Sequence, residues 1–270
     1  ARLLSDMREA HREVTMSNVT TLKSNKSSDV ELQQMRIDLA AAFRIAAQMN
    51  WHESVANHFS LAVSPDGKTF LMNPKWKHFS LIRASDLLLL DSTDPETMKR
   101  ADAPDTSAWA IHGGIHANLP HARCLLHVHS PYATALATLA DPELKPIEQN
   151  TARYFNRMAI DLHFSGIADD RAEGERLARV LGNKSRMMMG NHGVLIAGAS
   201  VAEAFEDLYY LERACQTMVL AYSTGQKLNI MSDEMAEKTA RGWEDYGGMA
   251  FAHFEDQKRM LDRIDPSYRD

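Results

Sequence analysis

The chain has 270 residues, of which 44% are hydrophobic and 24% charged, with a formal net charge of −6. This composition is typical of a globular protein with one large core, and the negative charge argues against nucleic acid or an anionic membrane as a partner. No apolar stretch approaches the ~20 residues that a membrane span needs, and none has the pattern of a signal peptide, so we expect a cytoplasmic protein.

The first half of the chain predicts an extension, a helix and several short strands. Residues 1–30 are polar with little periodicity, which predicts a loosely held N-terminal extension. From Val30 to Asn50 the apolar residues recur at helical spacing. Alternating patterns on either side of an Asp-Gly turn predict a hairpin over 58–64 and 69–73, followed by a short strand at 87–91. A helix is predicted from 106 or 107 to about 118.

The second half predicts strands alternating with helices. Strands are expected at 123–129, 186–189 and 193–197, and helices at 131–139, 170–181 and 200–222, with mixed strand and loop over 144–166. The tail at 232–261 is helical in pattern and rich in aromatics and Met, which suggests a subunit interface. We therefore predict an α/β fold, a three-layer α/β/α sandwich with a mixed, largely antiparallel sheet. The predicted domain comprises 31–225, between the extension and a helical C-terminal part at 226–270, which is expected to pack on the domain or on a neighbouring subunit.

Three histidines form the most informative pattern. His127 and His129 are two residues apart in an apolar run, and His192 lies far downstream in an Asn-His-Gly turn between two predicted strands. Residues i and i+2 of a strand point to the same face, so His127 and His129 can converge on one point. Neutral imidazole is the commonest protein ligand for Zn, Mn and Fe ions, and three ligands with open positions are typical of a catalytic site. These residues predict a divalent-metal centre.

The sulfur-containing residues indicate core rather than chemistry. Cys124 and Cys215 lie in apolar segments, where buried thiols in a reducing compartment are the favoured interpretation and a disulfide is the alternative. The run Met187–Met189 fits a core strand, since a soft-metal site would need converging thioethers.

Several motifs, in order, resemble the class II aldolase/adducin family. They are Asn57-His58-Phe59-Ser60, the run 85–91, the helix 107–112, Leu125-Leu126-His127-Val128-His129-Ser130 and Gly190-Asn191-His192-Gly193 before a helix starting at Ser200. The resemblance covers about residues 30–225. It implies an α/β/α fold, a C4 homotetramer with active sites near subunit interfaces, and a divalent ion bound by His127, His129 and His192.

One departure from the family points to a particular branch. Sugar-phosphate aldolases of the family carry a Ser-Ser-Glu triplet whose Glu acts as base, whereas this chain has Thr106-Ser107-Ala108. A methyl group can neither bind metal nor move a proton. The chain thus resembles the branch that decarboxylates hydroxylated aromatic acids, which implies a substrate such as 3-hydroxy-2-methylpyridine-4,5-dicarboxylate, an intermediate of vitamin B6 degradation, and manganese as the preferred ion (Zn, Co or Fe being the alternatives).

The expected reaction is loss of a carboxylate ortho to a ring hydroxyl, with the electrons passing into an enolate that a divalent cation stabilises. An acid must then protonate the ring carbon. The candidates are His163, Tyr154, His112 and water on the metal, and spacing does not choose among them. A second carboxylate of the substrate needs donors or cations, for which we expect Asn57, Lys75, Lys77, Ser107 and Arg153.

Two other functions are compatible with these residues. One is aldolase or epimerase action on a sugar or hydroxy-keto acid, with another residue in place of the missing Glu. The other is a metal-free interaction module of the adducin type, which the retention of all three histidines disfavours. His116, four residues after His112 on the predicted helix, is expected to pack rather than bind metal.

Overall fold

The computed structural model describes residues 28–166 and 170–270, so most of the predicted extension at 1–30 lies outside the described residues. Its centre is a sheet in the order β3-β2-β1-β4-β7-β6-β5, in which only the β5–β6 pair is parallel. The strands are β1 (His58–Ala62), β2 (Thr69–Met72), β3 (Leu88–Asp91), β4 (Cys124–Val128), β5 (Met158–Asp161), β6 (Arg186–Met189) and β7 (Gly193–Gly198). The predicted mixed, largely antiparallel sheet is confirmed.

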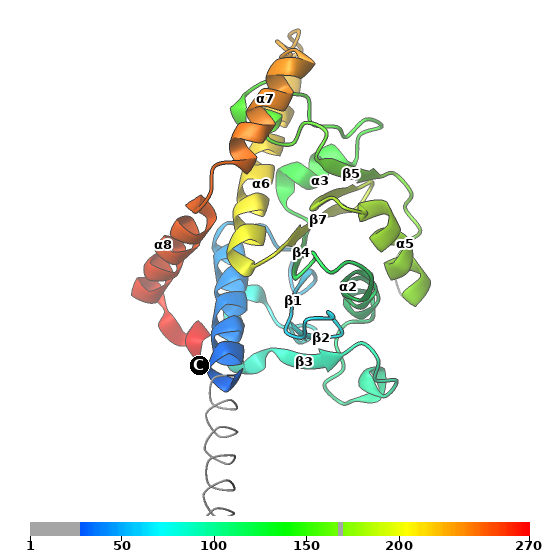
Figure 1. The fold of residues 1–270 in the computed structure, drawn as a ribbon, viewed down its shortest axis with the longest axis vertical. Coiled ribbons are helices and arrows are strands. Elements are labelled where there is room, and N and C mark those ends of the chain that lie inside the picture. The colour runs from blue at the N-terminus through cyan, green and yellow to red at the C-terminus, as the bar shows by residue number, and fades with distance from the viewer. Residues whose placement is uncertain (1–27, 167–169) are drawn as a thin grey trace, which may run out of the picture.

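Helices cover both faces of this sheet (Figure 1). One face packs against α2 (Thr106–Asn118) and α5 (Arg171–Leu181), and the other against the helix at 28–48, α3 (Pro131–Ala137) and α6 (Val201–Ser223). The remaining helices are α4 (Gln149–Ala152), α7 (Asp233–Glu244) and α8 (Met249–Ile264), with short 3-10 turns at Phe79–Leu81, Ala84–Asp86, Thr97–Lys99 and Pro266–Arg269. The three-layer α/β/α class follows from this arrangement.

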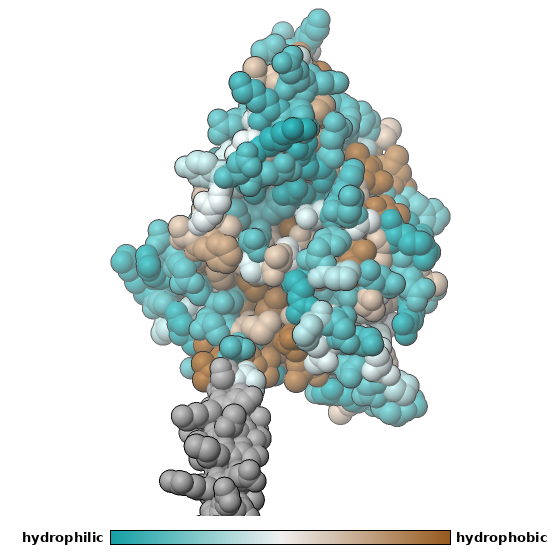
Figure 2. All heavy atoms as spheres, viewed as in Figure 1, coloured by the Kyte–Doolittle hydropathy of each residue, from teal (hydrophilic) through white to brown (hydrophobic). Residues whose placement is uncertain are grey.

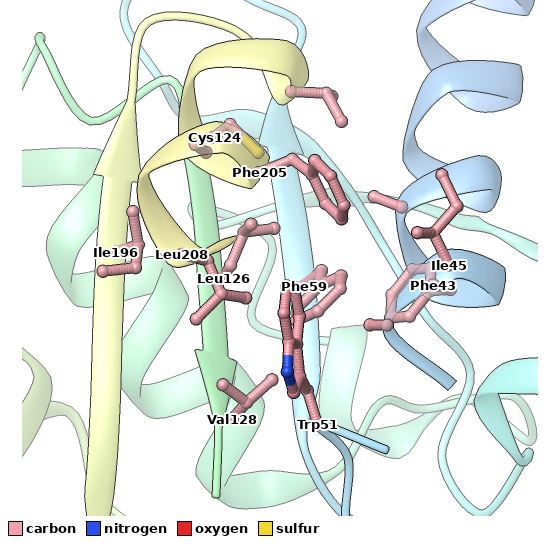
Figure 3. Packing of buried hydrophobic residues seen from close by; sticks show 14 of the residues in the cluster. Phe43, Ile45, Trp51, Phe59, Cys124, Leu126, Val128, Ile196, Phe205 and Leu208 are labelled. Atoms are coloured by element: carbon pink, nitrogen blue, oxygen red, sulfur yellow. The ribbon is translucent and has the colours of Figure 1, made fainter. Parts of the chain in front are cut away.

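Alternation along β4 divides the core between the two faces. Leu125 belongs to the apolar cluster under α2 and α5, whereas Leu126 belongs to the larger cluster under α6. In the larger cluster the Phe43 ring stacks on Phe59 at 4.6 Å and meets the edge of Phe79 at 4.6 Å (Figure 3). His127, two residues after Leu125, therefore points to the α2 side of the sheet.

The two cysteines are buried and free. Cys124 begins β4 in the larger apolar cluster, and Cys215 lies in the middle of α6. Burial raises the pKa of both thiols above its usual range, because a thiolate would lose its hydration there. They contribute apolar volume to the core, which is the favoured interpretation from sequence, and form no disulfide.

Sequence periodicity located most elements but missed two features. The helix α4 lies in the segment predicted as strand and loop, and the C-terminal tail is divided at Gly248, whose φ of 86° precedes α8. The tail also packs within its own chain, since Lys258 of α8 forms an ion pair of 2.7 Å with Asp38. Figure 2 shows that hydrophilic residues cover most of the face around α7. No helix among the described residues is both long and apolar enough to cross a membrane.

Candidate metal centre

The three predicted ligands meet at one end of the sheet. His127 and His129 come from the end of β4, and His192 from the turn between β6 and β7. Each ring offers one nitrogen as a ligand atom, and these three nitrogens lie within 4.8 Å of one another. The turn depends on Asn191, whose φ of 57° lies in the left-handed region that Asn tolerates better than most residues. The fold thus brings together side chains separated by more than sixty positions.

The ring orientations leave nitrogens free to bind an ion. The Nδ1 of His127 donates to the carbonyl of Val194 at 3.0 Å, and the Nδ1 of His129 pairs with the Glu53 carboxylate. A partner on one ring nitrogen fixes the ring and its tautomer, as is usual for metal-ligating histidines. The Nε2 of His129 is then buried without any hydrogen-bond partner among the described residues. A divalent ion would satisfy that atom, so the residues fit such an ion.

Burial favours the neutral form of His127 and His192, which is the form that metals require. Desolvation lowers the pKa of His192 to about 4 and that of His127 well below its usual value, and neighbouring histidines lower both further. Neutral rings with free Nε2 atoms are good ligands for a borderline ion such as Zn²⁺. Three protein ligands would leave coordination positions open to a substrate.

A cavity of about 730 Å³ opens over the triad. Its size falls in the range of small-molecule sites. The apolar lining includes Val55, Trp76, Ile111 and Phe164. Phe164 lies close to the metal side, with its ring centroid 6.1 Å from that of His192. Flat apolar walls beside a cluster of imidazoles suit a planar ring that carries oxygen ligands for an ion.

Asn57 offers a donor to anything bound there. Its backbone is left-handed (φ 59°), and its Oδ1 accepts from the backbone N–H of Glu53 at 2.9 Å and of His129 at 3.4 Å. These bonds fix which way the amide faces. The Nδ2 is buried without a partner in the described residues, and the residue lines the cavity. An oxygen acceptor on a ligand would satisfy this amide group.

The carboxylates that line the cavity are both engaged with the protein. Glu53 pairs with His129, and Asp105 is the N-cap of α2, accepting from the N–H and the hydroxyl of Ser107 at 2.9 and 2.6 Å. Ala108, in the first turn of α2, also lines the cavity. Each of these carboxylates is thus held through one oxygen, and neither occupies the position of Ala108.

A buried chain of polar side chains leads from the cavity into the protein. The Nδ1 of His58 contacts the Nε2 of His112 at 2.7 Å, and the other nitrogen of His112 contacts the Ser60 hydroxyl. That hydroxyl lies 2.7 Å from the Nε2 of His116, whose Nδ1 lies 2.8 Å from the carbonyl oxygen of Ala122. We call His58, His112, Ser60 and His116 the relay. His116, expected only to pack, makes two hydrogen bonds.

Among the candidate substrate-binding residues, Asn57, Lys75 and Ser107 line the cavity, whereas Lys77 and Arg153 do not. Lys77 forms an ion pair of 2.6 Å with Asp86. Arg153 lies against the rings of Tyr210 and Trp243, at 4.9 and 5.1 Å, in a separate cavity of about 390 Å³. Arg153 directly follows α4, the helix that the sequence pattern did not reveal, and this helix places it in the other cavity.

The three candidate proton donors also have different locations. His112 is buried behind His58 and reaches the cavity only through it. The Tyr154 hydroxyl donates to the carbonyl of Asp207 at 3.0 Å, and Tyr154 does not line the cavity. His163 is exposed, lies on the loop after β5, and likewise does not line it. The structure thus places Tyr154 and His163 outside the cavity over the triad.

His58, Glu53 and Asp105 line the cavity but were not singled out from the sequence. A signal for His58 existed, because His58 and Ser60 repeat at the two-residue spacing of His127 and His129. Two such strands side by side would present four polar side chains on one face. Glu53 lies in an irregular segment without periodicity and gave no comparable signal.

Comparison with known proteins identifies the family. Residues 37–219 match the model of the class II aldolase and adducin N-terminal domain. The chain belongs to the class II aldolase and adducin family. A Caulobacter vibrioides protein of the aldolase class 2 group is 32% identical over 250 residues, covering 91% of this chain and 95% of the relative. The family assignment made from the histidine motifs is confirmed.

Two further members of the class II aldolase and adducin family are informative. The crystal structure of an aldolase II superfamily protein from Pseudomonas syringae has a TM-score of 0.79 at 34% identity, covering 88% of this chain and 96% of that one. The decarboxylase NovR of Streptomyces niveus is 26% identical over 215 residues, which is 77% of this chain and 79% of NovR. Relatives named as a decarboxylase and as adducins both match this chain, so the site must decide the activity.

Proposed function

We propose that this member of the class II aldolase and adducin family is a divalent-metal-dependent carboxy-lyase. Its substrate would be a hydroxylated aromatic dicarboxylate such as 3-hydroxy-2-methylpyridine-4,5-dicarboxylate. The observation that carries the proposal is a histidine triad with Ala108 where the sugar-phosphate aldolases carry their base, while Glu53 and Asp105 each hold another group of the protein through one oxygen. Decarboxylation needs an electron sink and no base to start, which fits this site. The similarity to NovR, named a decarboxylase, supports the same reaction.

The chemistry requires a place for the electrons left by CO2. When the ring carbon that bears the carboxylate takes up a proton and the ring hydroxyl gives up its own, the ring becomes a β-keto acid. Cleavage of the C–C bond then releases CO2 and leaves the electron pair on the ring oxygen as an enolate, with the new hydrogen already on the carbon. A divalent ion on the triad would act as Lewis acid for the developing negative charge. Manganese is our proposed ion, and Zn, Co and Fe share the same ligand preferences.

The chain's own residues would bind and orient the ring. The free Nδ2 of Asn57 would donate to a carboxylate oxygen, and Lys75, which lines the cavity, would supply a positive charge. Phe164 and Trp76 would exclude water from the ring faces. A sugar phosphate has no flat apolar face to place against these two rings.

We also propose that the protein is a homotetramer whose neighbouring copies help close the cavity. The edge strand β5 and the loop after it leave Ile160, Leu162 and Phe164 exposed by 37%, 56% and 51%. An exposed apolar edge is a natural surface for another subunit. Phe164 also lines the cavity, so a partner on this edge would narrow its opening. The mass in solution, measured by light scattering, tests the assembly.

A direct test is to measure CO2 release from 3-hydroxy-2-methylpyridine-4,5-dicarboxylate and from 3,4-dihydroxyphthalate by protein loaded with Mn²⁺ or Zn²⁺. We expect release with at least one of them, and none from the His192→Ala variant, which lacks a ligand. Cleavage of a sugar phosphate without CO2 release would instead establish an aldolase. A protein that holds no ion and turns over neither class would be an interaction module of the adducin type.

A further inference from the structure

The relay has only one self-consistent arrangement of protons when its histidines are neutral. It ends at the carbonyl oxygen of Ala122, which can only accept, so the Nδ1 of His116 must carry the proton. The Nε2 of neutral His116 is then bare and must accept from the Ser60 hydroxyl, 2.7 Å away. A hydroxyl has a single proton, and this contact uses it.

The same logic continues to the cavity. Ser60 has given its proton to His116, so its oxygen accepts from the Nδ1–H of His112. The Nε2 of His112 is bare and accepts from the Nδ1–H of His58 at 2.7 Å. The Nε2 of His58 is therefore left without a proton. Among the described residues it has no hydrogen-bond partner, and His58 lines the cavity over the triad.

Burial supports the neutral state of all three rings. His58, His112 and His116 are at most 6% exposed. Desolvation lowers the pKa of His116 to about 4, and it lowers the pKa of His112 as well. At neutral pH each ring thus has one proton and one bare nitrogen, as the chain of hydrogen bonds requires.

We infer that the relay holds His58 as a fixed hydrogen-bond acceptor, and that His58 thereby selects ligands presenting a hydroxyl group next to the group bound by the histidine triad. The ring of His58 lies 4.9 Å from that of His127, yet His58 does not belong to the group of converging ligand atoms. It stands beside the ion position rather than on it. A ligand without an O–H there would leave the buried nitrogen unpaired, and such unpaired groups dominate discrimination between analogues.

This inference deepens the proposed function, since a hydroxyl ortho to a carboxylate is the feature that the proposed substrates share. It does not need turnover. A ligand such as salicylate carries both groups, whereas benzoate has only the carboxylate. The two differ at the atom that His58 would recognise.

The first experiment reads the tautomers directly. Long-range 1H–15N correlation spectra of the zinc-loaded protein should show a protonated Nδ1 and a bare Nε2 for His58, His112 and His116 alike. The signals are assigned to individual rings with variants in which one histidine at a time is replaced. A proton on the Nε2 of His58 would overturn the inference, because the acceptor would then be a donor.

The second experiment measures selectivity by calorimetric titration of the zinc-loaded protein with salicylate and with benzoate. Salicylate and benzoate differ in their own affinity for zinc, but this difference is the same in every variant. It therefore cancels when the ratio of the two affinities is compared between variants. Replacing His58 by Leu, of similar size but without an acceptor, should reduce the preference for salicylate about tenfold. His121→Leu makes the same change at an exposed histidine outside this cavity and should preserve the preference.

The outcomes separate this inference from the proposed function. A preference unchanged in His58→Leu, with one zinc ion still bound, would refute the role of His58 even if the protein releases CO2. Conversely, the expected tautomers and loss of preference would stand even if no dicarboxylate is decarboxylated. The signals of His58 can be assigned by exclusion from the variants at the other histidines, so poor folding of the Leu variant does not remove the test.

Discussion

His58 lies directly opposite His127 in the antiparallel β1–β4 pair, with the two ring centroids 4.9 Å apart. This register joins the relay to the metal centre, because side chains at paired positions share one face of the sheet. A shift of one residue would move His58 to the opposite, apolar face and separate the two groups. The hydrogen-bonded sheet thus fixes both the ligands and the polar groups beside them.

Removing one ligand tests the metal centre. His129→Ala should weaken binding of Zn²⁺ or Mn²⁺ by more than about 100-fold and should abolish turnover. This loss is larger than the loss typical when only a group that hydrogen-bonds a metal ligand is removed. The side chain lies at the rim of the cavity, so the far-UV circular dichroism spectrum should not change. Metal content by mass spectrometry is the measurement, with His121→Ala as the control. Full activity of His129→Ala after chelator treatment would contradict the mechanism.

Glu53 should act on the metal through His129. Its carboxylate holds the Nδ1 of that ring, and its own side chain is 63% exposed. We expect Glu53→Gln to weaken metal binding about 10–100-fold while leaving the melting temperature nearly unchanged. Competition with a zinc indicator measures the affinity, and the same change at exposed Glu96 serves as control. Equal affinities in the two variants would show that His129 needs no such support.

The backbone of β7 leaves no room for a side chain behind His129. A Cβ on Gly193 would lie 2.6 Å from the carbonyl oxygen of Val128 and 2.8 Å from the Cδ2 of the His129 ring. Gly193→Ala should therefore displace the ring and lower metal affinity by about tenfold or more, although every ligand is still present. Gly242→Ala adds the same methyl group where nothing lies within 4 Å and should not affect metal binding. Indicator titrations of both proteins provide the comparison.

Sequence patterns were sufficient for the elements that carry the ligands. The two-residue spacing of His127 and His129 placed them on one face of a strand, and the apolar run that contains them located β4 in the core. The turn at His192 followed from two strand patterns with a polar break between them. Periodicity is a local property, and these features are local.

The parts that the sequence could not provide depend on contacts between distant segments. The relay needs α2 packed on β1, so that His112 and His116 meet Ser60 from fifty-two and fifty-six positions away. Arg153 was expected to bind a substrate carboxylate and Tyr154 to act as an acid, whereas the fold carries both towards α6 and α7. Tertiary packing, which has no periodic signature, decided each of these positions.

The relay should make stability depend on pH. The pKa of His116 is about 4 in the folded protein and near 6.5 when unfolded, because burial disfavours the charged ring. Between these values the unfolded state binds the extra proton, so stability falls as the pH drops from about 6.5 to 4, by up to about 3 kcal/mol. Gln does not titrate, so in His116→Gln the unfolding free energy should depend less steeply on pH, by the contribution of about one proton. Urea unfolding at pH 7 and pH 5 measures it; parallel losses in both proteins would contradict the assignment.

Restoring a carboxylate at Ala108 distinguishes the two lyase reactions. The side chain of Ala108 lines the cavity, so Ala108→Glu would place a negative charge near the triad. It should repel a dicarboxylate and lower decarboxylation more than tenfold, while the bound ion is retained. Ala108→Gln has the same size without the charge and separates repulsion from steric obstruction.

The comparison of Glu and Gln at this position carries the argument further. If the charge alone is responsible, Ala108→Gln should keep most of the decarboxylation that Ala108→Glu loses, and the difference should shrink as salt is added. If instead Ala108→Glu increases turnover, the site lacks a base that its reaction needs, and an aldol-type cleavage would describe this protein better than loss of CO2. Assays of both variants on a hydroxylated dicarboxylate and on a sugar phosphate decide between these reactions.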